Sequence, residues 1–148
     1  MDGIEYVNEI SVKDYNMLRT AVGWNPVKEN RAQTGLDNTS FMIVAKCEKK
    51  TVGMVRVISD GGYVFYIADV IVHPEFQGHG IGRAMMERIV EYIDSQLEED
   101  HFIFTSLHAA KDKEDFYAKF GFITRPNEEY GAGMSLRRYF GDTKEMTK

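Results

Sequence analysis

The chain has 148 residues and a mass of 17.0 kDa, which is the size of one ordinary domain. Hydrophobic residues make up 43% and charged residues 28% of it, so a disordered or collagen-like protein is excluded. The formal net charge is −5, whereas a general nucleic-acid-binding surface is strongly basic. No apolar run approaches the roughly 18 residues of a membrane span. We therefore expect neither nucleic acid nor membrane as a partner.

The first ten residues, MDGIEYVNEI, contain acids and no apolar core, unlike a secretory signal. The single cysteine, Cys47, has no partner for an internal disulfide, which favours a reducing, cytoplasmic compartment. We expect one domain over residues 1–148, with a polar, frayed tail at Gly141–Lys148.

The N-terminal part of the chain predicts helices. Val12–Thr20 is expected to form one helix. The following segment, Ala21–Thr39, contains Trp24, Asn25-Pro26 and Gly35. These residues predict an interrupted segment, such as a helix pair with a mobile loop.

Three apolar runs then predict an antiparallel meander, and they lie at Phe41–Cys47, Thr51–Ile58 and Tyr63–Val72. Turn-forming residues separate the second run from the third. The third run is the most hydrophobic, and only Asp69 interrupts it. A charge in such a strand must be compensated if it is buried.

A glycine loop, Gln77–Gly82, follows the meander and leads into a long helical pattern. Apolar residues recur on one face of that pattern, at Ile81, Met85, Ile89, Tyr92, Ile93 and Leu97. The pattern therefore predicts an amphipathic helix that covers one face of a sheet.

The rest of the chain predicts a strand at Phe102–Leu107, a shorter helix at Lys111–Phe120 and weaker closing strands at Phe122–Thr124 and Met134–Tyr139. Strand, helix and strand in succession form a crossover, so strands 63–72 and 102–107 are expected to be parallel. In the shorter helix Phe116 and Phe120 are expected to face the core, with Gly121 just after the helix end. The fold class is mixed α/β, a mostly antiparallel sheet with helices on both faces.

Three glycines in five residues at a helix start disfavour the helix but leave backbone N–H groups free. Such a helix start suits a phosphate or pyrophosphate. A strand-to-helix turn that simply needs glycine is the alternative. The loop lacks the third glycine of a dinucleotide fingerprint, because Arg83 stands there, and it lacks the lysine of a P-loop.

The stretch from Val70 to Gly82 resembles the acetyl-CoA motif of the GNAT N-acetyltransferases, whose core pattern Q/R-x-x-G-x-G/A is met by Gln77, Gly80 and Gly82. A second segment, Phe116–Phe122, resembles the family's F-Y-x-x-x-G-F segment. The resemblance covers Phe41–Phe122 well and the first 40 residues poorly. It looks closest to a group of small-amine acetyltransferases, some of which act on arylalkylamines such as serotonin.

The resemblance implies a three-layer αβα fold in which strands 63–72 and 102–107 splay apart at their C-terminal ends. It implies that acetyl-CoA is the co-substrate and that no metal is needed. Its pantetheine arm would pair with the backbone of the first strand, and the glycine loop would hold its pyrophosphate. The cofactor residues so implied are Val70, Ile71, Val72, Gln77, Gly78, His79, Gly80, Ile81, Gly82 and Arg83.

The implied reaction is direct attack of an amine on a thioester. An alkylamine with a pKa near 10.4 is only about one part in 10³ neutral at pH 7, so a general base is useful. The resemblance makes Tyr117 the acid for the leaving thiolate, with a packing tyrosine as the alternative. Asp69 would bind the amine or relay its proton, or it would only hydrogen-bond a neighbouring loop. Because Ala68 stands where some relatives have glutamate, the base is expected to be Asp69 or a water molecule.

The acceptor pocket is expected to involve Trp24, Phe65 and Tyr66, although the two strand aromatics are equally suited to the core. The four histidines have no metal-ligand spacing. The expected partner is a small-molecule amine, with a protein lysine or N-terminus as the alternative, and the resemblance allows a homodimer through Met134–Tyr139. A non-catalytic acyl-CoA-binding module and a nucleotide-binding domain are the competing functions.

Overall fold

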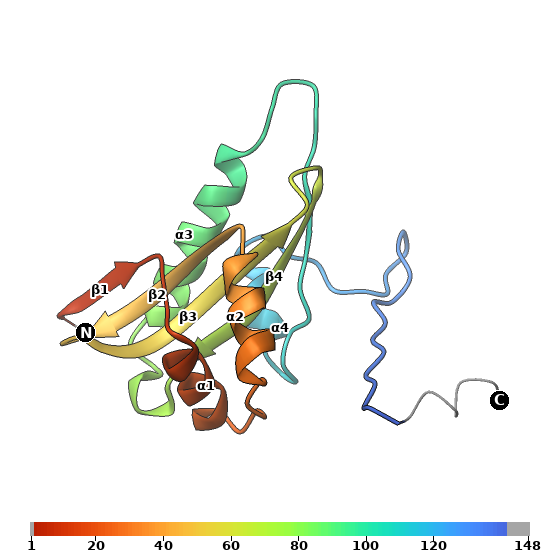
Figure 1. Ribbon diagram of the computed structural model, residues 1–148. Coiled ribbons are helices and arrows are strands. Elements are labelled where there is room, and N and C mark those ends of the chain that lie inside the picture. The colour runs from red at the N-terminus through yellow and green to blue at the C-terminus, as the bar shows by residue number, and fades with distance from the viewer. Residues whose placement is uncertain (1, 142–148) are drawn as a thin grey trace. The chain divides into compact units, whose positions relative to one another are not determined.

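The first part of the chain forms a five-stranded sheet whose strands lie in sequence order, β1 (Ile4–Val7), β2 (Phe41–Cys47), β3 (Lys50–Ser59), β4 (Val64–Val72) and β5 (Phe104–Ser106) (Figure 1). The computed structural model describes residues 2–141. They divide into two units, one ending at Leu107 and the other beginning at His108. Neighbouring strands are antiparallel up to β4, and β5 runs parallel to β4. The predicted mixed α/β sheet is thus confirmed.

The meander follows the hydrophobic runs closely. A two-residue turn joins β2 to β3, because Cys47 and Lys50 are register partners. Glu48 and Lys49 both have positive φ, 50° and 71°, which is the conformation of the tight hairpin turns. Strand β1 was not predicted, because it is short, carries the exposed Glu5 and pairs only at the edge of the sheet.

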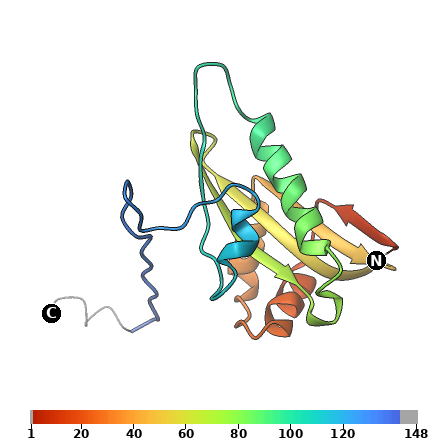
Figure 2. The ribbon, with the colours of Figure 1, turned by 180° about the vertical axis from the view of Figure 1, so that it is seen from behind.

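Helices cover both faces of this sheet, with α1 (Val12–Ala21) and α2 (Glu29–Asp37) on one face and α3 (Ile81–Ser95) on the other (Figures 1 and 2). Tyr15 and Leu18 of α1 pack with Val44 in one core cluster. On the opposite face, Phe41 stacks on Tyr92 of α3 with ring centroids 4.1 Å apart. Alternate residues of β2 therefore supply the two layers of core, as the period of a strand requires.

Helix boundaries follow local signals. The Ser11 side chain caps α1 by accepting a hydrogen bond from the Asp14 backbone N–H at 3.1 Å. Helix α3 buries four residues of its predicted apolar face, Ile81, Met85, Ile89 and Ile93, and in addition Met86, which was not predicted. It ends at Ser95, and Leu97 beyond it is exposed. Among the described residues, none of the helices combines the length and the apolarity needed to cross a membrane.

The second unit has less regular structure than its sequence predicts. Helix α4 (Glu114–Ala118) is shorter than the predicted 111–120, and it buries Tyr117 while Phe116 and Phe120 are only partly buried. Gly121 follows it with a φ of 94°, as expected for a glycine beyond a helix end.

The two closing strands that were predicted in this unit are not formed. Residues 122–124 and 134–139 have no strand ladder in the described part of the chain, so both predictions were wrong. Their apolar side chains remain exposed, as at Ile123, Met134 and Leu136. Apolar alternation alone does not make a strand where no neighbouring ladder is paired. Of the predicted tail, residues 142–148 lie outside the described residues.

Candidate functional site

A bulge interrupts β4 at its only charged residue. Ala68 is the register partner of Arg56 and Ile71 that of Met54, so Asp69 and Val70 together lie opposite one residue of β3. Asp69 has a φ of 54°, a left-handed backbone conformation that residues other than glycine rarely adopt. An extra residue reverses the alternation of a strand. As a result, Ile71 packs with α1 and α2, whereas a regular strand would keep it on the face of Ile67.

The two parallel strands separate after a short contact. Val64–Tyr66 pairs with Phe104–Ser106, and no further pairing of β4 with β5 is present. His73 donates its backbone N–H to the carbonyl of Val52 in β3 at 2.8 Å. By strand alternation, the backbone groups of Val72 and Val70 point the other way, toward the unpaired edge of β4. This edge has the splayed geometry that the family resemblance implied.

The glycine loop lies directly after this edge, between a short 3₁₀ turn (η1, Pro74–Phe76) and α3. Gly78 and Gly80 have φ of 82° and 81°, which explains the need for glycine at both. The first helical hydrogen bond runs from Ala84 N–H to the Gly80 carbonyl at 3.0 Å, and no side chain caps this helix.

The backbone N–H groups at the start of α3 consequently have no acceptor within the described residues. They belong to Ile81, Gly82 and Arg83. Together with the helix dipole they form an anion-binding position. The Arg83 side chain is paired along the helix, where its Nε donates to Glu87 Oε1 one turn further on at 2.9 Å.

Side chains around the loop support its backbone. Gln77 donates its Nε2–H to the carbonyl of Val72 at 2.9 Å, which ties the loop to the end of β4. A carbonyl has a second lone pair, so Val72 retains the capacity to accept another hydrogen bond. Ile71 and Ile81 are buried, and His79 is exposed. The residues predicted for the cofactor thus lie in two segments, the end of β4 and the loop that leads into α3.

Asp69 lies in a cluster of donors rather than at a free surface. Its Oδ1 accepts from Arg19 Nη1 at 3.0 Å, and its Oδ2 accepts from Arg56 Nε at 2.7 Å and from the Tyr15 hydroxyl at 2.9 Å (Figure 1 shows the helix and strands involved). The side chain of Asp69 is only 9% exposed. Three of the roughly four acceptor positions of the carboxylate are therefore in use, which favours the structural alternative over the role of a base.

Both arginines of this cluster also lie near the C-terminal end of a helix. Arg56 Nη1 also donates to the Gly35 carbonyl near the end of α2, at 3.1 Å, and Arg19 itself lies in the last turn of α1. Helix C-termini carry partial negative charge. Two guanidinium groups are thus balanced by one carboxylate and two helix ends.

The sequence patterns did not lead to a prediction for three members of this cluster, Tyr15, Arg19 and Arg56. Arg56 interrupts an apolar strand just as Asp69 does, and this shared pattern of two opposite charges in neighbouring strands was the available signal. Arg19 and Tyr15 follow helical spacing (i, i+4), so they share a face. Burial and the neighbouring Asp69 carboxylate raise the pKa of Tyr15, so it stays a neutral hydroxyl donor.

The predicted acceptor aromatics are distributed over both faces of the sheet. Phe65 is buried and is the register partner of Ser59, on the face that α3 covers. Tyr66, the partner of Ile58, lies on the opposite face, that of Asp69. Trp24 is 38% exposed and its ring lies 5.4 Å from the Arg19 guanidinium carbon. Trp24 and Tyr66 thus share a face with Asp69, and Phe65 has the position of a core residue.

In the second unit, Tyr117 is 8% exposed and packs edge-on against Phe116 and Phe122. Burial raises the pKa of Tyr117 above its ordinary 10.0. Its hydroxyl makes no hydrogen bond within the described residues. A phenol in this state is protonated at neutral pH and can act as a proton donor.

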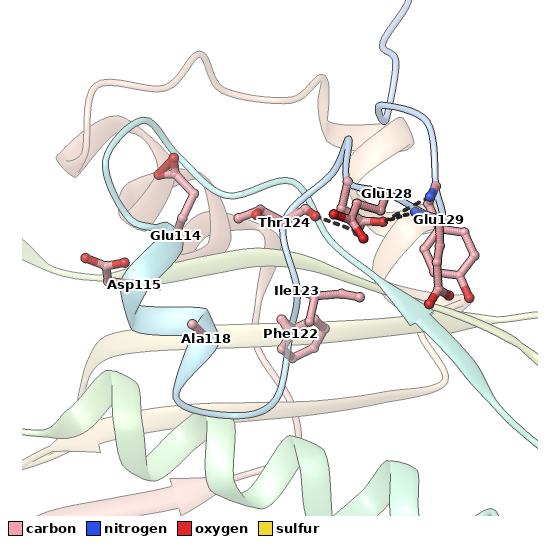
Figure 3. Close-up of a pocket in the computed structure, with 10 residues that line it drawn as sticks. Glu114, Asp115, Ala118, Phe122, Ile123, Thr124, Glu128 and Glu129 are labelled. Atoms are coloured by element: carbon pink, nitrogen blue, oxygen red, sulfur yellow. Dashed lines mark hydrogen bonds between the residues drawn. The ribbon is translucent and has the colours of Figure 1, made fainter.

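The second unit also contains a cavity of about 640 Å³ that the sequence did not predict (Figure 3). Its acidic lining comes from Glu114 and Asp115 of α4 and from Glu128 and Glu129 of the following loop, with Phe122 and Tyr130 as aromatic lining. All four acids are exposed. Among residues 2–141, no cluster of three or more potential metal ligands occurs.

Comparisons with known proteins agree with this geometry. Residues 15–139 match the family model "Acetyltransferase (GNAT) domain". An uncharacterized N-acetyltransferase, ycf52 of Pyropia yezoensis, is 32% identical over 122 residues, which are 80% of this chain and 68% of that protein. A solved structure from methicillin-resistant Staphylococcus aureus, SA2161, described as a probable acetyltransferase, superimposes with a TM-score of 0.81 at 33% identity and covers 91% of this chain and 99% of that one.

Two more distant relatives are named after different acceptors. Histone acetyltransferase TAP1 of Glycine max is 29% identical (80% of this chain, 54% of that protein), and serotonin N-acetyltransferase 2 of Oryza sativa is 27% identical (80% and 59%). The chain spans just over half the length of each. The family match, the sheet with its splayed strands and the glycine loop lead to one conclusion: the chain belongs to the GNAT family and is an acetyltransferase.

Proposed function

We propose that the enzyme transfers the acetyl group of acetyl-CoA directly to the primary amine of a small molecule. The observation that carries this proposal is the unpaired edge of β4 at Val70 and Val72, which continues into the uncapped start of α3. An extended chain with amide groups fits the first feature, and a pyrophosphate fits the second. Acetyl-CoA contains both parts in that order.

The predicted cofactor residues act mainly through their backbone in this proposal. The backbone groups of Val70 and Val72 pair with the pantetheine amides, while Ile71 keeps the strand in register through β3. The N–H groups from Gly78 to Arg83 bind the pyrophosphate. This arrangement holds a polyanion locally although the protein as a whole has a net charge of −5.

The proposed reaction is a direct transfer. The neutral amine attacks the acetyl carbonyl carbon, a C–N bond forms, and the C–S bond breaks to release the thiolate of CoA. We assign the proton that the thiolate needs to Tyr117, on the basis of the F-Y-x-x-x-G-F resemblance and of its protonated state. The nitrogen loses two protons, one from the ammonium group before the attack and one after the C–N bond forms. We assign both to water rather than to Asp69, whose two oxygens already accept hydrogen bonds, and water returns one proton to the Tyr117 phenolate.

A small amine is the preferred acceptor because of the environment of Trp24. This side chain is partly exposed on the face of the sheet that carries Asp69, where an aromatic ring can contact an arylalkylamine. The acidic net charge suits a cationic acceptor of either kind and does not decide between a small amine and a lysine. A protein lysine is the second candidate, since the relative from soybean is named a histone acetyltransferase.

The experiment is release of CoA thiol, measured over arylalkylamines, polyamines, aminoglycosides, amino acids and lysine peptides. Acetylation of a small amine with a higher kcat/KM than any peptide supports the proposal, and the reverse order supports the protein acceptor. Thermal shift with CoA, ATP and NAD separates the other classes. Stabilisation by CoA without turnover on any amine would indicate a non-catalytic module, and stronger stabilisation by ATP or NAD would contradict the proposal.

A further inference from the structure

Backbone hydrogen bonds continue from α1 into the segment that joins it to α2, residues 22–28, among them Trp24 N–H to the Arg19 carbonyl at 2.9 Å. Beyond these, two side chains attach the segment to the first unit by hydrogen bonds at two points. At one point, the Asn16 side chain brackets Val27: its Nδ2 donates to the Val27 carbonyl at 2.9 Å, and its Oδ1 accepts from the Val27 N–H at 2.8 Å. At the other, Arg19 Nε donates to the Asn25 carbonyl at 2.8 Å, with the Trp24 ring over the same guanidinium. Arg19 therefore fixes the part of the segment that carries Trp24.

The same guanidinium also reaches the cofactor strand. Arg19 Nη1 donates to Asp69 Oδ1 at 3.0 Å, and the side chains are 20% and 9% exposed. A guanidinium is planar and its donors are fixed relative to one another. Asn25 and Asp69 therefore bind donors of one planar group, so a displacement of either residue changes where that group meets the other.

Asp69 lies at the bulge of β4, and the bulge determines the direction of the backbone groups that follow it. It is the left-handed residue of the bulge, and the bulge determines which edge of the sheet Val70 and Val72 address. Any ligand that pairs with Val70 and Val72 has to accept the conformation in which Asp69 is held. The holding contacts of Asp69 thus act on the cofactor edge through the backbone.

We propose that Arg19 is a positioning residue that couples the segment 22–28 to the cofactor edge of β4. The conformation of the acceptor side of the site then depends on the conformation of the acetyl-CoA side. This inference rests on the proposed function, because it assumes that CoA pairs with β4. Binding of CoA shifts the bulge into one conformation, and the Arg19 guanidinium transmits this to Trp24. By thermodynamic linkage, an acceptor that contacts Trp24 raises the affinity for CoA by the same factor by which CoA raises the affinity for that acceptor.

Arg56 provides the matched control for Arg19. It donates to the other oxygen of the same carboxylate, at 2.7 Å, but its second contacts are the Gly35 carbonyl and the Thr39 hydroxyl, at 3.1 and 2.9 Å. Both arginines therefore stabilise the bulge, whereas only Arg19 contacts the segment 22–28. A general loss of the bulge would affect the two variants alike, and a specific coupling would not.

The test uses Trp24 as its probe, because it is the only tryptophan of the chain. CoA is titrated into the wild type, Arg19→Met and Arg56→Met, with calorimetry for the affinity and Trp24 fluorescence for the segment. We expect CoA to change the Trp24 emission of the wild type and of Arg56→Met, and to bind Arg19→Met without that change. Once an acceptor amine is identified, the wild type should bind CoA at least about fivefold more tightly in its presence, and Arg19→Met should not.

Other results overturn the inference. It fails if CoA binds the wild type without altering Trp24 emission, or if Arg19→Met retains the change. If Arg19→Met does not fold, Arg19→Lys keeps the charge but loses the planar fork, and it should bind CoA with a smaller Trp24 response than Arg56→Lys. Absence of CoA binding to the folded wild type would instead overturn the proposed function, and the coupling with it.

Discussion

Arg56 donates its Nε–H to Oδ2 of Asp69 at 2.7 Å, and this pair spans the bulge of β4 from the neighbouring strand. Because Asp69 has a left-handed backbone, the contact stabilises a conformation that costs free energy by itself. The two charged residues that interrupt the apolar strands β3 and β4 thus neutralise each other as an ion pair. The pair explains why the most hydrophobic strand of the protein contains a carboxylate.

Replacement of Asp69 tests whether it is structural or catalytic. Asp69→Ala leaves Arg19 and Arg56 without their shared partner in a largely buried place, so we expect a loss of about 3 kcal/mol in the free energy of unfolding. Asp69→Asn retains acceptor capacity and should lose less. Urea denaturation of both variants measures the difference.

The kinetic result for Asp69→Asn distinguishes the two roles. A lost general base lowers turnover by about 100-fold or more and removes the acidic limb of the pH–rate profile. We expect Asp69→Asn to keep that limb and to keep kcat within about tenfold of the wild type at saturating acetyl-CoA. A flat profile with a collapsed kcat would instead identify Asp69 as the base.

Gly80→Ala tests the backbone at the start of α3. Gly80 has a φ of 81°, so an alanine there is strained by about 1 kcal/mol or more. We expect the strain to shift the N–H groups that follow it and to weaken acetyl-CoA binding about tenfold, as calorimetry would show.

Gly61→Ala is the matched control for this change. Gly61 has a similar φ of 88°, and like Gly80 it has nothing within 4 Å of an added Cβ, but it lies in the turn before β4. It should lose comparable stability and bind acetyl-CoA normally. Equal affinity losses in both variants would mean that the glycine loop is not the cofactor position.

The sequence predicted the sheet more reliably than the site, for a physical reason. The strands and α3 follow local periodicity, so runs such as Phe41–Cys47 could be placed almost to the residue. The bulge at Asp69 could not be placed, because it depends on pairing with β3. The pairing of Asp69 with Arg19, fifty residues earlier in the chain, is likewise a tertiary contact that no local pattern contains.

The C-terminal predictions failed for a related reason, because strand formation also depends on pairing that is not local. Met134–Tyr139 has enough apolar residues to read as a strand, but a strand exists only where another strand supplies hydrogen bonds. The short α4 and the burial of Tyr117 in place of Phe116 show the same limit. A five-residue helix has too few turns for its periodicity to define one face.

Tyr117→Phe tests the proposed acid. The change removes one hydroxyl and keeps the ring that packs against Phe116 and Phe122. We expect kcat to fall about 100-fold, which is within the range for loss of a general acid, with the acetyl-CoA dissociation constant within about twofold of the wild type. Tyr63→Phe, at a tyrosine that is 48% exposed, should leave both parameters unchanged. An unchanged kcat in Tyr117→Phe would reduce Tyr117 to a packing residue.

We also expect the wild type and Tyr117→Phe to differ in stability at alkaline pH. Burial raises the pKa of Tyr117 above 10.0 in the folded protein, while the unfolded chain titrates near that value. Below pH 10 both states hold the proton, so this group adds no pH dependence. Above it the unfolded state releases its proton first, and the free energy of unfolding falls until the pH passes the folded pKa. The tyrosine therefore destabilises the folded protein only in alkaline solution.

Denaturation by urea at pH 8 to 11 measures this effect. We expect the wild type and Tyr117→Phe to change in parallel between pH 8 and pH 9, which serves as the internal control. Above pH 10 the wild type should lose stability more steeply, because phenylalanine has no proton to release. The burial of Tyr15 raises its pKa in the same direction in both proteins, so it cancels in the comparison. Parallel curves up to pH 11 would show that the Tyr117 hydroxyl is solvated in the folded state, which would remove the desolvation on which its protonated role depends.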